Sequence, residues 1–316
     1  MPIRLLGIVL LFILVSCSSK ESRIAEAIDA ESQVATERLD QLQEALNKGQ
    51  LRNARILNEY ANHLREKKPE LETLIEQLAT DATSKGPMFE SLKQRLFDAK
   101  YSPQLFSDWS EQLGEIQLIS EASSTAAFND ALSDPVNVLA DMSEGELARV
   151  NAQSKSSELT SNQAKDYGAG SQLVGNPNYG QWVQGNGMSF WEWYGMYALL
   201  SDLTDRRRIR YSDWSRYRGY SYYNDWGRER YTSPTKKRAQ TTIDTRTKKS
   251  FQSEGKRFTS PYAKRKTGGS QLSRKTKTTP ITQQFSQRST YGSRSSYSGS
   301  TRSGSSRTSR GLGRGK

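Results

Sequence analysis

The sequence contains one cysteine, Cys17, and one histidine, His63, so the residue types behind most metal and nucleophilic chemistry are scarce. A zinc site needs several Cys or His ligands, and the common triads need a histidine beside the nucleophile. His63 lies among polar residues of a predicted helix, which favours an ordinary surface position. Carboxylates are plentiful, but paired acid and base catalysis needs a pocket that spacing alone does not reveal. We therefore expect no metal, no cofactor and no enzymatic activity.

The surroundings of Cys17 indicate a different chemistry for its thiol. Arg4 is followed by an apolar run from Leu5 to Val15, and the small residue Ser16 precedes the cysteine. This pattern is typical of a secretory signal peptide. The run is shorter than the roughly 20 apolar residues that a transmembrane helix needs. The single thiol excludes a disulfide within the chain, but it can carry a diacylglycerol thioether.

The residues Leu14-Val15-Ser16-Cys17 resemble the lipobox of bacterial lipoproteins processed by the lipoprotein signal peptidase, signal peptidase II. The resemblance implies that residues 1–16 are removed and that Cys17 is lipidated. Ser18 stands where an aspartate would favour the inner membrane, so the resemblance implies a lipid-anchored protein of the cell outer membrane, facing the periplasm or the surface. Two or three acyl chains anchor far more strongly than one. The alternative is an ordinary signal peptide with a chance cysteine.

Charge is distributed unevenly along the chain, whose net charge is +12. Residues 17–135 contain 13 Lys and Arg against 21 Asp and Glu, whereas residues 206–316 contain 29 against 5. This split predicts an acidic body and a basic tail. After the signal peptide we divide the chain into four parts: an acidic helical domain at 17–133, a polar linker at 134–174, an aromatic-rich segment at 175–231 and a basic tail at 232–316.

Apolar residues between Glu21 and Leu118 recur at helical spacing, which predicts several helices. Breaks are expected at Lys48-Gly49, Lys67-Lys68-Pro69 and Ser84 to Pro87, and Ser102-Pro103 would begin a fifth helix. Short connections favour antiparallel neighbours, so the predicted fold class is mostly α, a small bundle or stacked helical hairpins. A stack of tetratricopeptide repeats is an alternative, but the sequence lacks the pattern of that repeat. Residues 21–47 could also self-associate as a coiled coil, but they contain fewer than four clean heptads.

The aromatic-rich segment contains five of the six tryptophans between Tyr179 and Tyr231. Ser189 and Glu192 fit a capping box, which predicts an apolar helix that runs to Leu203. Such a helix could be core on the acidic helices, lie at a membrane interface or seat a protein partner. The arginines at 206–208, just beyond its end, would suit all three.

Between Ile209 and Tyr231 aromatic residues alternate with arginines, a combination that suits stacking on sugars or nucleobases. The alternative is a compact aromatic subdomain whose arginines stack internally. The stretches Tyr179-Gly180-Gln181-Trp182 and Phe190-Trp191-Glu192-Trp193-Tyr194-Gly195 resemble a family of uncharacterised proteobacterial lipoproteins, which implies no activity. The candidate binding residues of the segment are Tyr179, Trp182, Trp191, Trp193, Tyr194, Arg206, Arg207, Arg208, Trp214 and Trp226.

The tail at 232–316 is rich in Ser, Arg, Lys and Gly, which predicts disorder. Its composition is similar to that of RNA-binding segments, but a signal peptide directs it out of the cytoplasm, so intracellular nucleic acid is not an expected partner. The anionic partners in the envelope are lipopolysaccharide, peptidoglycan and acidic polysaccharide. The alternative to polyanion binding is that the tail is a solvated spacer. We expect a lipid-anchored envelope adaptor or scaffold, for which a protein is a further candidate partner. The alternative is a glycan- or peptidoglycan-binding lipoprotein acting through the aromatic segment.

Overall fold

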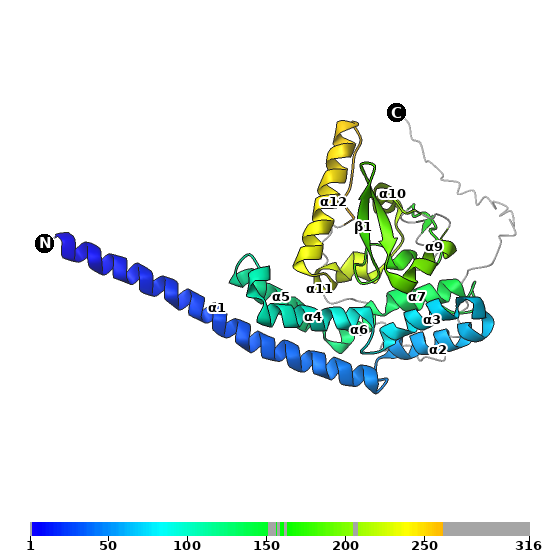
Figure 1. The fold of residues 1–316 in the computed structure, drawn as a ribbon, viewed down its shortest axis with the longest axis horizontal. Coiled ribbons are helices and arrows are strands. Elements are labelled where there is room, and N and C mark those ends of the chain that lie inside the picture. The colour runs from blue at the N-terminus through cyan, green and yellow to red at the C-terminus, as the bar shows by residue number, and fades with distance from the viewer. Residues whose placement is uncertain (1, 151–155, 157–158, 161–162, 205–207, 262–316) are drawn as a thin grey trace, which may run out of the picture.

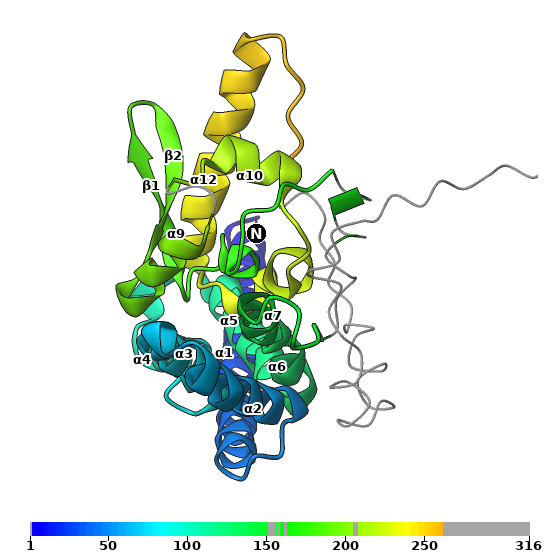
Figure 2. The same cartoon turned by 90° about the vertical axis from the view of Figure 1, so that its right-hand side faces the viewer.

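The structure is a computed structural model that describes residues 2–150, 156, 159–160, 163–204 and 208–261, with backbone alone before residue 21. It is mostly helical, as the apolar periodicity predicts. Figures 1 and 2 show two layers: an α-helical half built from the first 142 residues, and above it an aromatic half built from residues 163–261. None of the described helices combines the length and apolar character needed to cross a membrane.

The α-helical half consists of seven consecutive helices joined by short turns. Single 3-10 turns at Pro69–Leu71, Thr80–Ala82 and Pro103–Leu105 separate some of them. The helices are α1 (Pro2–Asn47), α2 (Arg52–Lys67), α3 (Glu72–Ala79), α4 (Pro87–Tyr101), α5 (Trp109–Ala122), α6 (Thr125–Ala131) and α7 (Ser133–Met142).

All four expected helix breaks are confirmed, since α4 also ends at Tyr101, directly before Ser102. Gly49, with a φ of 61°, lies in the turn that follows α1. Pro69 follows α2, and Pro87 begins α4. The start of the fifth helix was predicted wrongly, because Pro103 begins only a 3-10 turn and α5 starts at Trp109. Asp108 provides the cap, since its carboxylate accepts a hydrogen bond from the Glu111 backbone N–H at 2.8 Å.

Helix α1 packs along α5, and the two run in the same direction. Arg38 of α1 donates to the Ser120 carbonyl oxygen at 3.3 Å and to its hydroxyl at 3.1 Å. The next elements also meet, because the Asn53 backbone N–H at the start of α2 donates to the Asn129 side chain of α6 at 2.8 Å. The start of α5 therefore points toward the N-terminal half of α1, as Figure 1 shows.

The interpretation of residues 134–174 as a polar linker was wrong for much of this stretch. Every residue of α7 is buried, and Leu173 and Val174 are buried as well. The stretch is polar in composition, but its polar groups are paired inside the protein. The Asn137 side chain accepts from the Val150 N–H at 2.7 Å and donates to the Val150 carbonyl at 3.0 Å, so a polar helix can be core.

The aromatic half contains a two-stranded antiparallel hairpin, β1 (Gly180–Gly185) and β2 (Met188–Trp193), in which Trp182 faces Trp191. The predicted apolar helix from Ser189 to Leu203 was therefore wrong. Asn186 and Gly187 form the turn with φ values of 51° and 74°, which is the geometry of a two-residue hairpin loop. Only a 3-10 turn at Gly195–Leu199 and the short helix α9 (Leu200–Leu203) are helical in that stretch.

The remaining helices follow the hairpin in the chain. They are α10 (Tyr211–Tyr217), a π-helical turn at Tyr223–Gly227, α11 (Arg228–Tyr231) and α12 (Pro234–Ser253). The prediction that residues 232–316 are disordered throughout was wrong for Pro234–Ser253, because these 20 residues form helix α12. Residues 262–316 lie outside the described residues.

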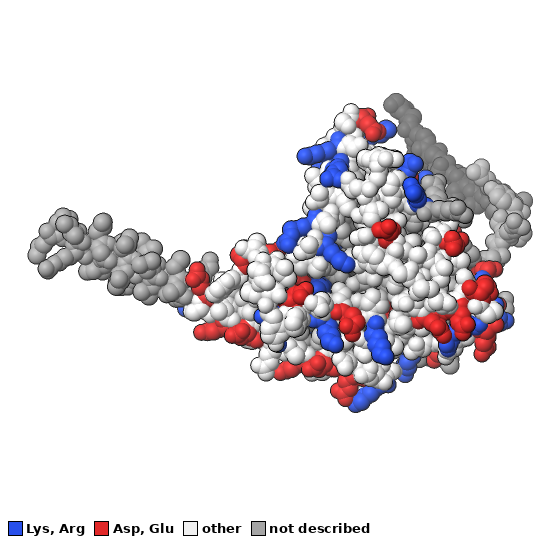
Figure 3. All heavy atoms as spheres, in the orientation of Figure 1, with Lys and Arg blue, Asp and Glu red and all other residues white. Residues whose placement is uncertain are grey.

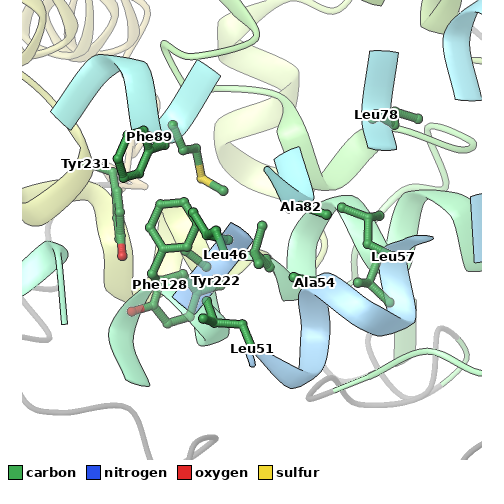
Figure 4. Close-up of a cluster of buried hydrophobic side chains, with 14 of the residues drawn as sticks. Leu46, Leu51, Ala54, Leu57, Leu78, Ala82, Phe89, Phe128, Tyr222 and Tyr231 are labelled. Carbon is green, nitrogen blue, oxygen red and sulfur yellow. The ribbon is translucent and has the colours of Figure 1, made fainter. Parts of the chain in front are cut away.

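One hydrophobic core joins the two halves. Figure 4 shows Tyr222 and Tyr231 of the aromatic half beside Phe89, Phe128 and Leu46 of the α-helical half. A second cluster lies within the aromatic half and includes Trp191, Tyr211, Trp214 and Ile243. The two halves therefore share a core, and the aromatic segment is not an appendage on a linker.

Candidate polyanion-binding surface

The candidate surface is centred on helix α12, which is strongly basic. Six Lys and Arg and one Asp occur between Pro234 and Ser253. Ser233 is the N-cap of this helix, because its hydroxyl oxygen accepts a hydrogen bond from the Lys236 backbone N–H at 3.4 Å. Pro234 occupies the first turn, where proline is favoured. Gly255, with a φ of 68°, ends it.

One face of α12 docks on the aromatic half through a few buried groups. Ile243 belongs to the second hydrophobic cluster. The Gln240 amide donates to the Gly175 carbonyl at 3.1 Å and to the Tyr223 hydroxyl at 3.0 Å, and the Tyr211 hydroxyl donates to Asp244 at 2.8 Å. These contacts hold the helix in one orientation and direct its opposite face to solvent.

The exposed face of α12 has basic side chains of two kinds. Lys237 pairs with Glu229, and Arg238 pairs with Glu111 of α5 at 2.8 Å. Further along the helix, Arg246, Lys248 and Lys249 are exposed, and no carboxylate of the described residues forms an ion pair with them. We call these three residues the α12 cation group.

Aromatic residues support the helix end that follows the α12 cation group. The guanidinium of Arg216 from α10 lies 4.3 Å from the centre of the Phe251 ring, and Phe251 contacts Phe258 at 5.3 Å between ring centres. The exposed residues Lys256 and Arg257 lie on the returning chain, where Lys256 pairs with Glu254 at 2.7 Å. This end of the molecule is therefore basic on two adjacent segments.

Acidic residues gather on the other half of the molecule. Figure 3 shows acidic side chains along the α-helical half and basic ones around α12. Residues 21–142 contain far more Asp and Glu than Lys and Arg. The carboxylates nearest to the α12 cation group in sequence are Asp244, which accepts a hydrogen bond from Tyr211, and Glu254, which pairs with Lys256.

This arrangement favours binding an extended polyanion over binding a small molecule. Exposed lysine and arginine side chains act mainly as charges and hydrogen-bond donors toward phosphate or carboxylate oxygens. No group of Cys, His, Asp and Glu among the described residues could hold a metal ion. Binding at such a surface depends on charge density and should weaken as salt is added.

The structure leaves none of the candidate aromatic residues fully exposed. Tyr179, Trp191 and Trp214 are buried, and Trp182, Trp193, Tyr194 and Trp226 are partly buried. Trp182 has ring centres 5.1 Å from Trp191 and 5.0 Å from Trp214, so these three rings pack on one another. The compact aromatic subdomain is thus the interpretation that the geometry favours over a stacking platform for sugars.

The other predicted site residues are dispersed or lie outside the description. Arg208 is exposed, and its guanidinium lies 5.7 Å from the Phe190 ring centre. Arg206 and Arg207 lie outside the described residues. Cys17 falls within the helical backbone of α1, but its side chain is not described. Its lipidation therefore stays a prediction.

Two buried carboxyl groups join the halves, and sequence reasoning missed both. The Tyr179 hydroxyl donates to Asp81 at 3.0 Å, and burial raises the pKa of the Asp81 carboxyl to about 8. Asp134 accepts from the backbone N–H groups of Tyr222 and Tyr223 at 2.7 and 2.9 Å, and burial raises its pKa to about 7. Both side chains are bound to neighbouring protein groups, which indicates a structural role.

The sequence contains signals that could have found the missed elements. Asn186-Gly187 between two stretches rich in aromatic residues is a strong hairpin signal. Ser233-Pro234, followed by 20 residues before Gly255, is an N-cap and stop pattern for a helix. By contrast, no local pattern indicates that Asp81 and Asp134 are buried, because their partners are distant in sequence.

Comparisons with known proteins do not add a family to these observations. No protein-family model, no curated protein and no solved structure matches the chain.

Proposed function

We propose that the protein is a lipid-anchored adaptor of the bacterial cell envelope that binds an anionic envelope polymer through its basic end. The observation that carries the proposal is the α12 cation group, a cluster of exposed basic side chains without carboxylate partners among the described residues. The basic sequence at 262–316 follows directly after this surface and would extend it. The lipobox residues at 14–17 support the anchor.

The anchor and the basic surface belong to opposite parts of the molecule. Figure 1 shows the N-terminal end of α1 extending away from α12. An acidic α-helical half lies between them. In this proposal the lipid holds one end at the membrane, and the basic end reaches a second envelope component, of which lipopolysaccharide, peptidoglycan and acidic polysaccharide are the candidates.

The first experiment tests the anchor. We expect wild-type protein in cells to incorporate a labelled palmitate analogue and to fractionate with the outer membrane. Cys17→Ser should abolish both, because no other thiol is present to receive a diacylglycerol group. Undiminished lipid labelling of the variant would refute lipidation at Cys17, and wild-type protein in the soluble periplasmic fraction would refute the anchor itself.

The second experiment tests the basic surface with a matched control. Arg246→Gln, Lys248→Gln and Lys249→Gln are combined in one variant. In the control, Arg55→Gln, Lys67→Gln and Lys85→Gln remove three exposed basic side chains from the α-helical half. Both variants have the same net charge, so a difference between them reports position.

We expect immobilised lipopolysaccharide and purified peptidoglycan, assayed separately, to bind wild-type protein at low salt and to release it as salt is raised. A basic side chain at an anionic surface contributes about 1 kcal/mol, so the α12 variant should lose up to about 100-fold in affinity. The control should change little. Equal losses in both variants, or no binding of either polymer at low salt, would overturn the proposal.

A further inference from the structure

The turn between α4 and α5 exposes an unusual group of large apolar side chains. Eight large hydrophobic residues are exposed among the described residues, and four of them belong to this one turn and the helix ends beside it. Their exposed fractions are between 47% and 64%. We call this group the apolar tip, and it consists of Phe97, Tyr101, Leu105 and Trp109.

The composition of the apolar tip suits the headgroup region of a lipid bilayer. Trp and Tyr favour this region because each joins an apolar ring to a polar group. Lys93, Phe97, Lys100 and Tyr101 recur at intervals of three and four residues, so they share one face of α4. Both lysines are exposed, and Lys100 Nζ lies 5.7 Å from the Tyr101 ring centre. Exposed ammonium groups of this kind can pair with lipid phosphates.

Carboxylates of the same hairpin also lie near the apolar tip. Asp98 accepts from the Gln94 amide at 2.8 Å, Asp108 caps α5, and Glu111 pairs with Arg238. Because their donors are neutral, Asp98 and Asp108 keep their negative charge, so charges of both signs flank the apolar tip. Lys93 and Lys100 are exposed, and no ion pair with a carboxylate of the described residues engages them.

The position of the tip relative to α1 favours a membrane over a soluble partner. Helices α1 and α5 run in the same direction with Arg38 beside Ser120, so Trp109 is level with about residue 27 of α1. Cys17 precedes that level by about 10 residues, or roughly 15 Å of helix. Figure 1 shows the α4–α5 turn at the end of the α-helical half nearest the N-terminal part of α1.

We infer that the apolar tip rests in the headgroup region of the membrane that holds the lipidated Cys17, as a second, non-covalent contact. The inference rests on the proposed lipid anchor for its geometry. A lipid alone would let the protein rotate about one point, whereas two contacts orient it. The basic end with α12 would then face away from that membrane.

The test relies on Cys17 being the only cysteine of the sequence and on the proposed lipidation, which would consume its thiol. Leu105→Cys therefore gives the lipidated protein a single free thiol, to which an environment-sensitive fluorophore is attached. The matched control carries the fluorophore at Ala239→Cys, an exposed position on α12. Both proteins are reconstituted into vesicles of phosphatidylethanolamine and phosphatidylglycerol, and flotation separates bound from free protein.

We expect both labelled proteins to float with the vesicles, with blue-shifted emission at position 105 and water-like emission at position 239. Flotation with water-like emission at 105 would overturn the tip contact while leaving the anchor intact. A blue shift at 105 in detergent-free, lipid-free solution would indicate contact with a second copy and would also overturn it.

A separate experiment tests the tip contact if the lipid anchor is absent. If the protein does not float, the soluble Cys17→Ser chain labelled at position 105 is titrated with the same vesicles. Replacing the other three tip residues with serine should then weaken vesicle binding by about tenfold or more, because apolar area is lost from the contact. Replacing Val34, Met188 and Met196, which are exposed elsewhere, should leave binding unchanged. Equal binding by both triple variants, or no binding by the soluble chain, would refute the tip contact.

Discussion

The α-helical half and the aromatic half bury their interiors by different means. The α-helical half has an aliphatic core, in which Leu42, Leu57 and Ile75 are fully buried. The aromatic half buries tyrosines whose hydroxyls need partners, such as Tyr223 with Thr232 and Tyr231 with the Ala122 carbonyl. An aliphatic core depends mainly on volume and burial, whereas an aromatic core of this kind also depends on hydrogen-bond geometry.

The two halves meet through polar groups as well as apolar ones. The Arg95 side chain of α4 pairs with Glu115 of α5 at 2.6 Å and donates to the Arg230 carbonyl of α11 at 2.6 Å. The ion pair is almost fully buried, with side-chain exposures of 5% and 3%. A charge in such a place depends on its partner, because water does not replace it.

The largest expected loss of stability comes from breaking this contact. Glu115→Ala should lower the free energy of unfolding by about 4 kcal/mol, since Arg95 would stay buried without its carboxylate. Chemical denaturation monitored by circular dichroism measures the loss. The control is Glu76→Ala, whose partner Arg65 is exposed and 3.6 Å away, and which should cost less than about 1 kcal/mol. Similar values for both variants would show that the buried pair contributes no more to stability than an exposed one.

The aliphatic core provides the next largest effect. Leu57→Ala should cost about 3 kcal/mol, because it removes buried methyl groups and leaves a cavity in the packing shown in Figure 4. Differential scanning calorimetry would detect the lower unfolding temperature. Leu105→Ala, at the exposed apolar tip, should change stability by less than about 0.5 kcal/mol. A comparable loss at Leu105 would mean that the tip is covered in solution.

The aromatic core should respond to the loss of a single oxygen atom. Tyr231→Phe keeps the ring but removes the hydrogen bond to the Ala122 carbonyl at 3.0 Å, and we expect a loss of about 1 kcal/mol. Tyr60→Phe removes a corresponding bond to the Ala148 carbonyl at 2.7 Å and is the comparison in the α-helical half. Urea unfolding of both variants measures the difference. No loss at Tyr231 would reduce its role to packing.

The last expected effect is on the pH dependence of stability and concerns Asp81. Burial raises the pKa of this carboxyl from 3.8 to about 8, although the Tyr179 hydrogen bond acts in the opposite direction. Between these values the folded chain keeps a proton that the unfolded chain releases. The contribution of Asp81 is thus fully present below the unfolded pKa, decreases as pH rises and is lost by the folded pKa.

Asp81→Asn keeps an oxygen for Tyr179 and removes this titration, so its unfolding free energy should fall less steeply from pH 4 to pH 8 than that of the wild type. Equilibrium unfolding at several pH values tests the slope. Asp40→Asn, at an exposed position of α1, should retain the wild-type slope. If Asp81→Asn also retained it, the Asp81 carboxyl would titrate as an ordinary exposed group.

The amino-acid sequence determined much of the α-helical half without help from the tertiary structure. Apolar residues such as Ala35, Leu39, Leu42 and Leu46 repeat at helical spacing, and each of them is buried in α1. Proline and glycine ended several helices where expected, because their effects on the backbone are local. The asymmetry of charge also follows from sequence alone, since it requires only the order of the residues.

Only the tertiary structure decided the roles of the aromatic residues, of α7 and of α12. Phe190 and Trp193 suit an apolar helix as well as a strand, and pairing of β2 with β1 determined the outcome. Helix α7 reads as polar until Asp134 meets Tyr222 across 88 positions of sequence. Helix α12 is ordered by docking Ile243 and Gln240 on distant partners. Local patterns report local forces, whereas burial of a polar group depends on partners that folding brings from elsewhere in the chain.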